Sequence, residues 1–145
     1  AFREAAHPSF SDYAHQIVAN ARALADALGR QGFRLVSGGT DNHLMLIDLR
    51  SFDSELTGKE AQIALDRAGI TLNKNTVPDD PRSPFVTSGL RIGTPSVTTQ
   101  GMGVDDMSTI ADLMARVLRA PEDDSVIDSV RGEVGDLCGR YQPYP

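Results

Sequence analysis

The sequence is short of cysteine, of lysine and of long apolar runs, and each shortage excludes a class of protein. Its 145 residues include one cysteine, Cys138, which excludes an internal disulfide framework and favours a reducing, cytoplasmic location. No apolar run approaches the roughly 20 residues of a membrane span, and we expect no secretion signal and no membrane partner. With 14 basic and 20 acidic side chains, the formal net charge of −6 argues against a nucleic-acid binder.

The basic residues and the first residues of the chain are unusual. Only Lys59 and Lys74 are lysines among the 14 basic residues, the chain begins at Ala1, and its first methionine is Met45. We therefore expect a piece of a larger protein. The length fits one domain, and 40% apolar with 23% charged residues is ordinary for a folded chain.

Hydrophobic periodicity predicts most of the helices. Apolar residues at helical spacing predict a long helix that is capped by Ser9 and closed near Gly32. Thr57 and Glu60 form the pattern of a capping box, which starts a second helix. The remaining helices are expected at residues 1–6, from 105 to 118, and from 121 to 137, followed by a tail at 141–145.

Short strands complete the expected fold. They are predicted at residues 33–36, 43–49, 70–72 and 87–94. Residues 73–84 contain three prolines and two asparagines, so we expect an ordered loop without a regular ladder. Together these elements predict an α+β fold, in which a small, partly antiparallel sheet is packed with helices.

Arg91 is the strongest candidate for chemistry. Its strand neighbours Leu90 and Ile92 should point to the opposite face, because side chains alternate along a strand. Gly89 and Gly93 would allow a ligand or another backbone to come close. A guanidinium at this place fits a carboxylate bidentately. The alternatives are an arginine paired with a structural acid or a solvated side chain.

The segment 73–84 is a second candidate. Asn75 could bind the edge of a planar ligand through its donor and its acceptor together, and the prolines would hold that geometry. The alternative is a plain surface connection between neighbouring strands.

Other patterns predict no site. The three histidines lack metal-ligand spacing, and Asp79–Asp80 is typical of a turn, so we expect no metal. Gly58–Lys59 lacks the earlier glycine and the following hydroxyl of a phosphate loop. His43 is expected to be a hydrogen-bonded residue at a strand start, and Cys138 to pack on an apolar helix face.

Four consecutive motifs resemble serine hydroxymethyltransferase. They are Ser37–His43 (SGGTDNH), Leu56–Ala61 (LTGKEA), Asn73–Pro78 (NKNTVP) and Pro84–Pro95 (PFVTSGLRIGTP), in the order and at spacings compatible with the family. The resemblance covers nearly the whole chain but corresponds only to the carboxy-terminal third of such an enzyme. It implies the C-terminal domain of a pyridoxal-phosphate-dependent transferase of the aspartate aminotransferase-like group, fold type I.

The resemblance also implies a reaction and its site. Family members interconvert serine plus tetrahydrofolate with glycine plus 5,10-methylenetetrahydrofolate, in one-carbon metabolism and glycine biosynthesis, and pyridoxal phosphate acts as the electron sink. Arg91 matches the arginine that grips the substrate carboxylate. Asn75 matches the asparagine that contacts the folate pterin, and Ser83, Pro84 and Phe85 would lie near the same pocket. A cytoplasmic homodimer is expected.

The resemblance further implies how the chain is divided and what it lacks. Residues 1–32 would link this part to a large cofactor domain, and residues 33–145 would form the small domain. The family places its Schiff-base lysine after a threonine-rich run ending in histidine, a context that neither Lys59 nor Lys74 has. We therefore expect the catalytic lysine and most of the cofactor site upstream, and the 145 residues alone to be inactive.

One departure from the family keeps alternatives open. Gln100 stands where the family commonly has arginine. A hydroxymethyltransferase that acts on α-methylserine is therefore one alternative, and a stand-alone module that holds a small carboxylate through Arg91 is another.

Overall fold

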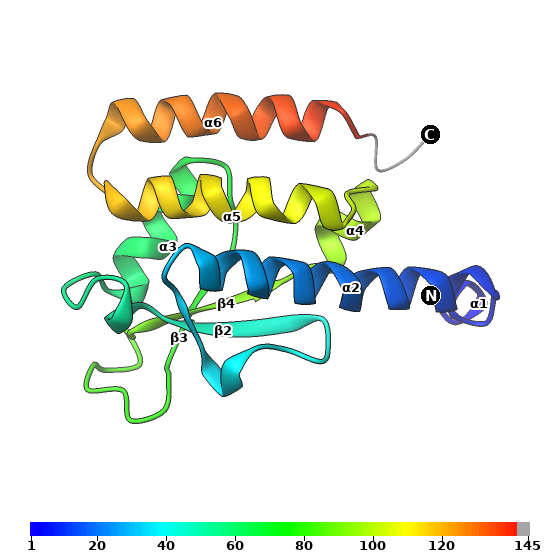
Figure 1. Ribbon diagram of the computed structural model, residues 1–145, viewed down its shortest axis with the longest axis horizontal. Helices are drawn as coiled ribbons and strands as arrows, with labels where there is room; N and C mark the ends of the chain where they lie inside the picture. Colours follow the sequence, from blue (N-terminus) through cyan, green and yellow to red (C-terminus); the bar gives the residue numbers. More distant parts are fainter. Residues whose placement is uncertain (142–145) are drawn as a thin grey trace.

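Helices cover one face of a small four-stranded sheet (Figure 1). This is the arrangement in the computed structural model, which describes residues 1–141. The helices are α1 (Phe2–Ala5), α2 (Ser9–Arg30), α3 (Gly58–Arg67), α4 (Pro95–Gln100), α5 (Val104–Arg119) and α6 (Asp124–Gly139). The strands are β1 (Arg34–Leu35), β2 (Leu44–Asp48), β3 (Asn73–Asn75) and β4 (Gly89–Gly93), with short 3₁₀ turns η1 (Val36–Gly38) and η2 (Leu49–Ser51). The α+β prediction is confirmed.

The sheet is antiparallel throughout, in the order β1-β2-β4-β3. β4 is a central strand, and Arg91 in its middle lies opposite Leu46 of β2 and Asn73 of β3. Because residues paired across an antiparallel ladder share a face, these three side chains lie on the same side of the sheet.

The core lies between the sheet and α2 and α5. Ala21, Leu24 and Leu28 of α2 are buried at the helical spacing expected from the sequence. Asn20, also fully buried, donates to the Thr98 hydroxyl at 2.9 Å and to the Met102 carbonyl at 3.0 Å, so the polar group inside the core is satisfied.

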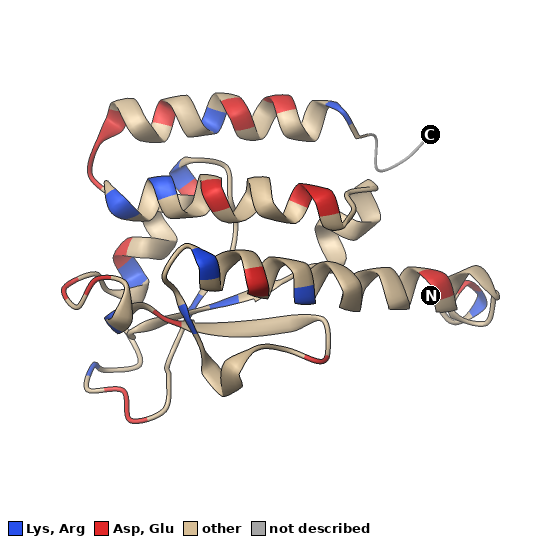
Figure 2. Cartoon of the chain, viewed as in Figure 1, with Lys and Arg blue, Asp and Glu red and all other residues tan. Residues whose placement is uncertain are grey.

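The outermost helix, α6, lies farthest from the sheet, and most of its charged side chains are acidic (Figures 1 and 2). It is joined to α5 by Arg116, whose two terminal nitrogens each donate to a Glu133 carboxylate oxygen at 2.8 Å. This bidentate pair lowers the pKa of Glu133, because the guanidinium hydrogen-bonds the charged form.

The expected start of α2 is wrong by one position. Pro8, and not Ser9, is the cap, and Ser9 is the first helical residue. Pro8 already has helical dihedrals, and a proline fits a helix start because it has no N–H that needs a partner there. The main-chain N–H of Ser9 donates instead to His7 Nδ1 at 3.3 Å.

The expected strand at residues 70–72 is also wrong. Gly69, with φ +82°, ends the turn after α3, and the Ile70 N–H donates back to the Leu65 carbonyl at 2.8 Å. The ladder begins only at Asn73, so the first residues of the expected loop form β3. The expected strand at residues 33–36 is shortened to two residues because Val36 starts the turn η1.

Two expectations near the C-terminus change as well. Cys138 is exposed, because the buried stripe of α6 ends at Leu137, one position earlier. Of the expected tail, the Tyr141 hydroxyl donates to the Asp106 carboxylate at 2.8 Å, and residues 142–145 lie outside the described residues. Among the described residues, no helix is both long and apolar enough to cross a membrane.

Candidate functional site

Arg91 is exposed on the face of β4 that the helices leave open. Leu90 is fully buried and Ile92 is 6% exposed, so both neighbours face the helices, as the alternation predicted. A Cβ on Gly89 would lie 2.4 Å from Val77 Cγ1 and 2.6 Å from the Ile47 carbonyl oxygen. This glycine therefore lets neighbouring segments approach β4 closely and does not make room for a ligand.

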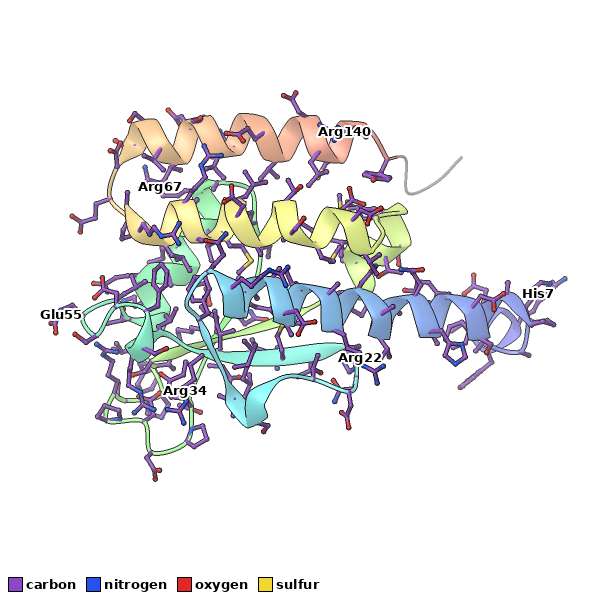
Figure 3. The ribbon with its side chains drawn as sticks, in the orientation of Figure 1. His7, Arg22, Arg34, Glu55, Arg67 and Arg140 are labelled. Carbon is purple, nitrogen blue, oxygen red and sulfur yellow. The ribbon has the colours of Figure 1, made fainter. Side chains whose placement is uncertain are left out.

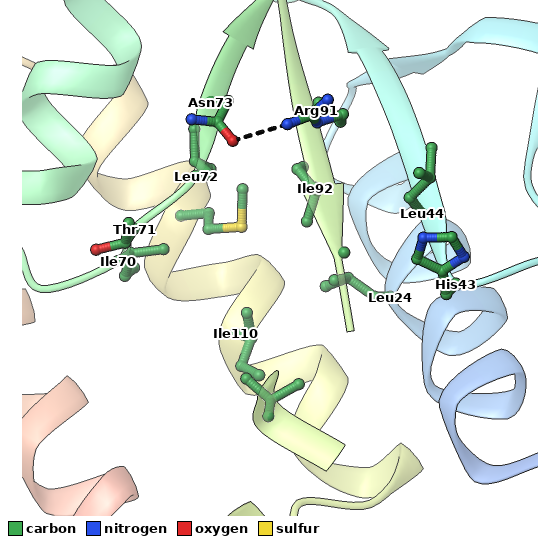
Figure 4. A pocket seen from close by; sticks show the side chains of 13 residues that line it. Leu24, His43, Leu44, Ile70, Thr71, Leu72, Asn73, Arg91, Ile92 and Ile110 are labelled. Carbon is green, nitrogen blue, oxygen red and sulfur yellow. Dashed lines mark hydrogen bonds between the residues drawn. The ribbon is translucent and has the colours of Figure 1, made fainter. Parts of the chain in front are cut away.

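A pocket of about 420 Å³ lies beside β4, with Arg91 and Asn73 at one end and apolar side chains of β4 and the helices, such as Ile92, Leu24 and Ile110, along the rest (Figure 4). Arg91 Nη2 donates to Asn73 Oδ1 at 3.1 Å, and His43 lies on the other side of β4, at the start of β2. Within residues 1–141, Arg91 forms no ion pair with a carboxylate. Most of the five N–H donors of the guanidinium remain available to an anion.

The polar residues that precede β2 mainly hold their own loop. The Thr40 hydroxyl donates to the Leu44 carbonyl at 2.6 Å, and Asn42 Oδ1 accepts from the Leu44 N–H at 2.9 Å. The main-chain oxygen of His43 accepts from the Thr94 N–H at 3.1 Å, as expected of a residue at a strand start. His43 and Asn73 both line the Arg91 pocket. Sequence spacing could not predict this, because their approach to Arg91 depends on the order of the strands in the sheet.

Asn75 ends β3 on the same face as Asn73 and Arg91. It is half-buried, and its Nδ2 donates to the Thr76 carbonyl at 2.7 Å. Beyond it, residues 76–88 form a connection to β4 that contains Ser83, Pro84 and Phe85. We call it the binding loop after the role that the sequence leads us to expect. All three are exposed, Phe85 to 83%, and the Lys74 ammonium ties this part to β3 by donating to the Pro84 carbonyl at 3.1 Å.

Asp80, which sequence reasoning assigned to turn chemistry, is the central acceptor of the binding loop. Its carboxylate accepts from the N–H groups of Val77, Arg82 and Ser88 at 3.2, 3.0 and 2.9 Å, and from the Ser88 hydroxyl at 2.7 Å. Burial raises the pKa of Asp80, but these hydrogen bonds favour the charged form and leave its pKa below the ordinary value.

Arg82 fastens the binding loop to the segment before α3. Its Nη2 donates to the Ser54 carbonyl at 2.7 Å, and its Nη1 to the Ser88 hydroxyl at 3.0 Å. The binding loop is therefore ordered by a hydrogen-bond network, as expected. The expectation that residues 73–84 have no regular ladder is wrong for 73–75, which pair with β4.

The two lysines lie in α3 and β3. Lys59 is exposed in the first turn of α3, where the Thr57 hydroxyl accepts from the Glu60 N–H at 3.1 Å and completes the capping box. Lys74 is engaged with Pro84. Within residues 1–141, no group of three His, Cys, Asp or Glu side chains is placed to hold a metal ion.

The sequence matches one enzyme family. The model of the family "Serine hydroxymethyltransferase" matches residues 1–114. The chain belongs to the serine hydroxymethyltransferase family. It is 52% identical over 145 residues to the serine hydroxymethyltransferase of Azoarcus sp. (strain BH72), and the aligned region covers 99% of this chain and 34% of that protein. It is 54% identical over 144 residues to the one from Halorhodospira halophila (strain DSM 244 / SL1), again covering 99% and 34%.

The chain thus spans about a third of the length of the curated serine hydroxymethyltransferases that it matches, 34% in both cases. The family match ends at residue 114, whereas the similarity to both relatives extends over the last helix, α6. Gln100, the departure noted in the sequence, is half-buried at the end of α4, outside the Arg91 pocket.

Proposed function

We propose that this chain is the carboxy-terminal part of a serine hydroxymethyltransferase that converts serine and tetrahydrofolate into glycine and 5,10-methylenetetrahydrofolate, and back. Its role would be to hold the substrate carboxylate and part of the folate. The observation that carries the proposal is Arg91, an exposed arginine beside a pocket of about 420 Å³ without a carboxylate partner in residues 1–141.

Arg91 binds the carboxylate of serine or glycine in this proposal. Asn73 accepts one N–H of the guanidinium at 3.1 Å, which orients the planar group while other donors stay free for a bidentate contact. A clamp of this kind fixes the orientation of the amino acid, and such positioning lowers a barrier by several kcal/mol, roughly 7–11 kcal/mol for well-oriented reactants.

The binding loop and the end of β3 receive the folate. The Asn75 side chain offers a donor and an acceptor to the edge of the pterin. Phe85, 83% exposed, offers an aromatic face whose burial by a ligand is favourable. Ser83 and Pro84 lie beside it in the chain, and Lys74 holds the Pro84 carbonyl in place.

The residues described here do not fit the covalent attachment of pyridoxal phosphate. Lys59 belongs to the first turn of α3, and the Lys74 ammonium donates to a main-chain carbonyl. We therefore propose that residues outside this chain supply the Schiff-base lysine and most of the cofactor site, and we assign no step of the reaction to the cofactor here.

The division of the chain follows the same proposal. Residues 1–32 would connect to the cofactor domain, and residues 33–145 would form the small domain of a cytoplasmic homodimer. α1 and the first turns of α2 extend beyond the sheet (Figure 1), and Phe2 of α1 and Phe10 of α2 are 94% and 41% exposed. The later turns of α2 are part of the core, so the linking helix and the small domain would move as one body.

The test of the reaction is an assay of the full-length protein with serine and tetrahydrofolate, followed by glycine formation. Turnover of serine supports the proposal. Turnover of α-methylserine alone would give the enzyme a different substrate, in line with Gln100. No turnover of either, together with serine binding by the 145 residues alone, would favour the stand-alone carboxylate module and overturn the proposal.

A further inference from the structure

Arg50 contacts the binding loop by donating hydrogen bonds to two of its main-chain carbonyls. Its Nη1 donates to the Asp79 carbonyl at 3.1 Å, and its Nη2 to the Pro78 carbonyl at 3.2 Å. Asp79 has φ +53°, in the left-handed region that residues with side chains seldom adopt. A backbone in that region persists only where surrounding contacts hold it, and Arg50 supplies two of them.

Arg50 is itself fixed by a buried carboxylate. Its Nε donates to Asp48 Oδ1 at 2.9 Å and its Nη2 to Asp48 Oδ2 at 2.7 Å, a bidentate pair. The Asp48 side chain is 3% exposed at the end of β2, and it also accepts from the Arg50 N–H at 3.1 Å. Arg34, labelled in Figure 3, reaches the same carboxylate at 3.5 Å.

The Asp48–Arg50 pair therefore fixes the position of the binding loop relative to the sheet. Asp48 lies opposite Gly89 in the ladder of β2 and β4, so its carboxylate is placed by the sheet itself. A buried charge that loses its partner is costly, and this keeps the guanidinium in one position under residues 78 and 79. At its ends the loop is closed by Asp80, which accepts from the Val77 and Ser88 N–H groups.

We propose that Asp48 and Arg50 are positioning residues for the folate site. They do not touch the ligand; they hold the binding loop so that Asn75 and residues 83–85 present a preformed surface to the pterin. The inference rests on the proposed function of that loop. A preformed loop lowers the cost of ordering the chain when the ligand binds, which increases affinity without a new contact.

A purely structural role predicts a different result from a positioning role. A structural pair lowers stability and affects both substrates alike. A positioning pair affects the substrate that its loop receives and leaves the substrate at Arg91 unchanged, since Arg91 is held by β4 and Asn73.

The experiment compares steady-state kinetics of the full-length holoenzyme and its Arg50→Met variant. We expect the KM for tetrahydrofolate to rise about tenfold, which corresponds to about 1.4 kcal/mol of lost binding free energy, while the KM for serine changes less than twofold. Arg50→Lys keeps the charge and should restore part of the affinity. Hydrogen–deuterium exchange of residues 76–88 should become faster in Arg50→Met.

Two further variants make the result decisive. Arg116→Met removes an equally bidentate arginine, paired with Glu133 between α5 and α6, and should change neither KM. Asn75→Ala tests the folate site itself. A raised folate KM in Asn75→Ala but not in Arg50→Met overturns the positioning role alone, and an unchanged folate KM in Asn75→Ala overturns the folate site.

The remaining outcomes also distinguish a structural role from a positioning role. An equal rise of both KM values in Arg50→Met shows a structural role only. Where Arg50→Met does not fold, Arg50→Lys and Asp48→Asn provide the same comparison, and unchanged folate KM values in both would contradict the inference.

Discussion

At the scale of single residues, the carboxylates that matter are those with several donors around them. Asp48 is nearly buried, and the hydrogen bond from Arg50 outweighs the effect of burial, so its pKa lies below the ordinary value. Asp80 accepts four hydrogen bonds within the binding loop. Both residues hold the same loop, and both require the charged form.

This predicts a loss of stability in acid. A carboxyl whose pKa is depressed by folding stabilises the protein fully above its unfolded pKa, about 3.9 for aspartate, and loses that contribution as the pH falls through the folded pKa. The melting temperature should therefore fall steeply below about pH 4. In Asp48→Asn it should be lower at pH 7, because Arg50 loses its partner, and should depend less on pH below 4.

Asp41→Asn, an exposed change in the loop before β2, is the matched control and should melt like the parent at each pH. Parallel pH profiles for the parent and Asp48→Asn would contradict this assignment.

At the scale of elements, the sequence predicted the helices whose caps and apolar spacing are local in the chain. It missed elements whose position depends on pairing with segments distant in the sequence. The capping box at Thr57 and the stripe of α2 were read from spacing alone, and both are confirmed. The position of β3 depends on pairing with β4, which local propensity does not encode, so the strand was expected three residues too early. The separate helix α4 was missed for a related reason, since the short segment Pro95–Gln100 shows little apolar period.

The same contrast holds for the site. Arg91 could be singled out because two buried neighbours and alternation settle its face. Asn73 and Arg50 could not, because their partners lie 18 and 29 residues away along the chain. The roles of Asn75 and residues 83–85 were reached through the family resemblance, and they stay proposals.

Two glycines give a test of how tightly the sheet is packed. Gly89→Ala would bring a methyl group within 2.6 Å of the Ile47 carbonyl and 2.4 Å of Val77, so we expect a loss of about 1–3 kcal/mol. Gly132→Ala in α6 meets nothing within 4 Å and should stabilise the helix by about 0.5–1 kcal/mol. Denaturant unfolding measures both, and equal effects of the two changes would refute the packing argument.

At the scale of the whole molecule, Arg91 and Asn75 lie on the open face of a sheet whose other face is covered by helices, and we propose that they bind substrates there. The binding loop lies next to β3 and β4 on this side, whereas the Arg91 pocket runs from Arg91 and Asn73 between the sheet and the helices, to Leu24, Ile92 and Ile110. Since the chain spans 34% of its relatives, we propose that the complete site forms where this face meets the rest of the enzyme.

This account predicts that the isolated 145 residues do not bind pyridoxal phosphate covalently. Mixed with one equivalent of the cofactor, they should give no stable visible-absorbing adduct, because Lys59 is solvated and Lys74 is engaged with Pro84. Mass spectrometry after borohydride reduction checks this. A single stoichiometric adduct on either lysine would mean that the chain holds its own cofactor site.

The central claim is that Arg91 holds the substrate carboxylate, and the KM for serine in the full-length Arg91→Ala enzyme tests it most directly. A charged hydrogen bond contributes about 1.5–3 kcal/mol, so we predict a rise of roughly ten- to a hundredfold, with a lower kcat. Arg22→Ala, an exposed arginine on α2 labelled in Figure 3, should change nothing. A serine KM in Arg91→Ala equal to that of Arg22→Ala would contradict the account.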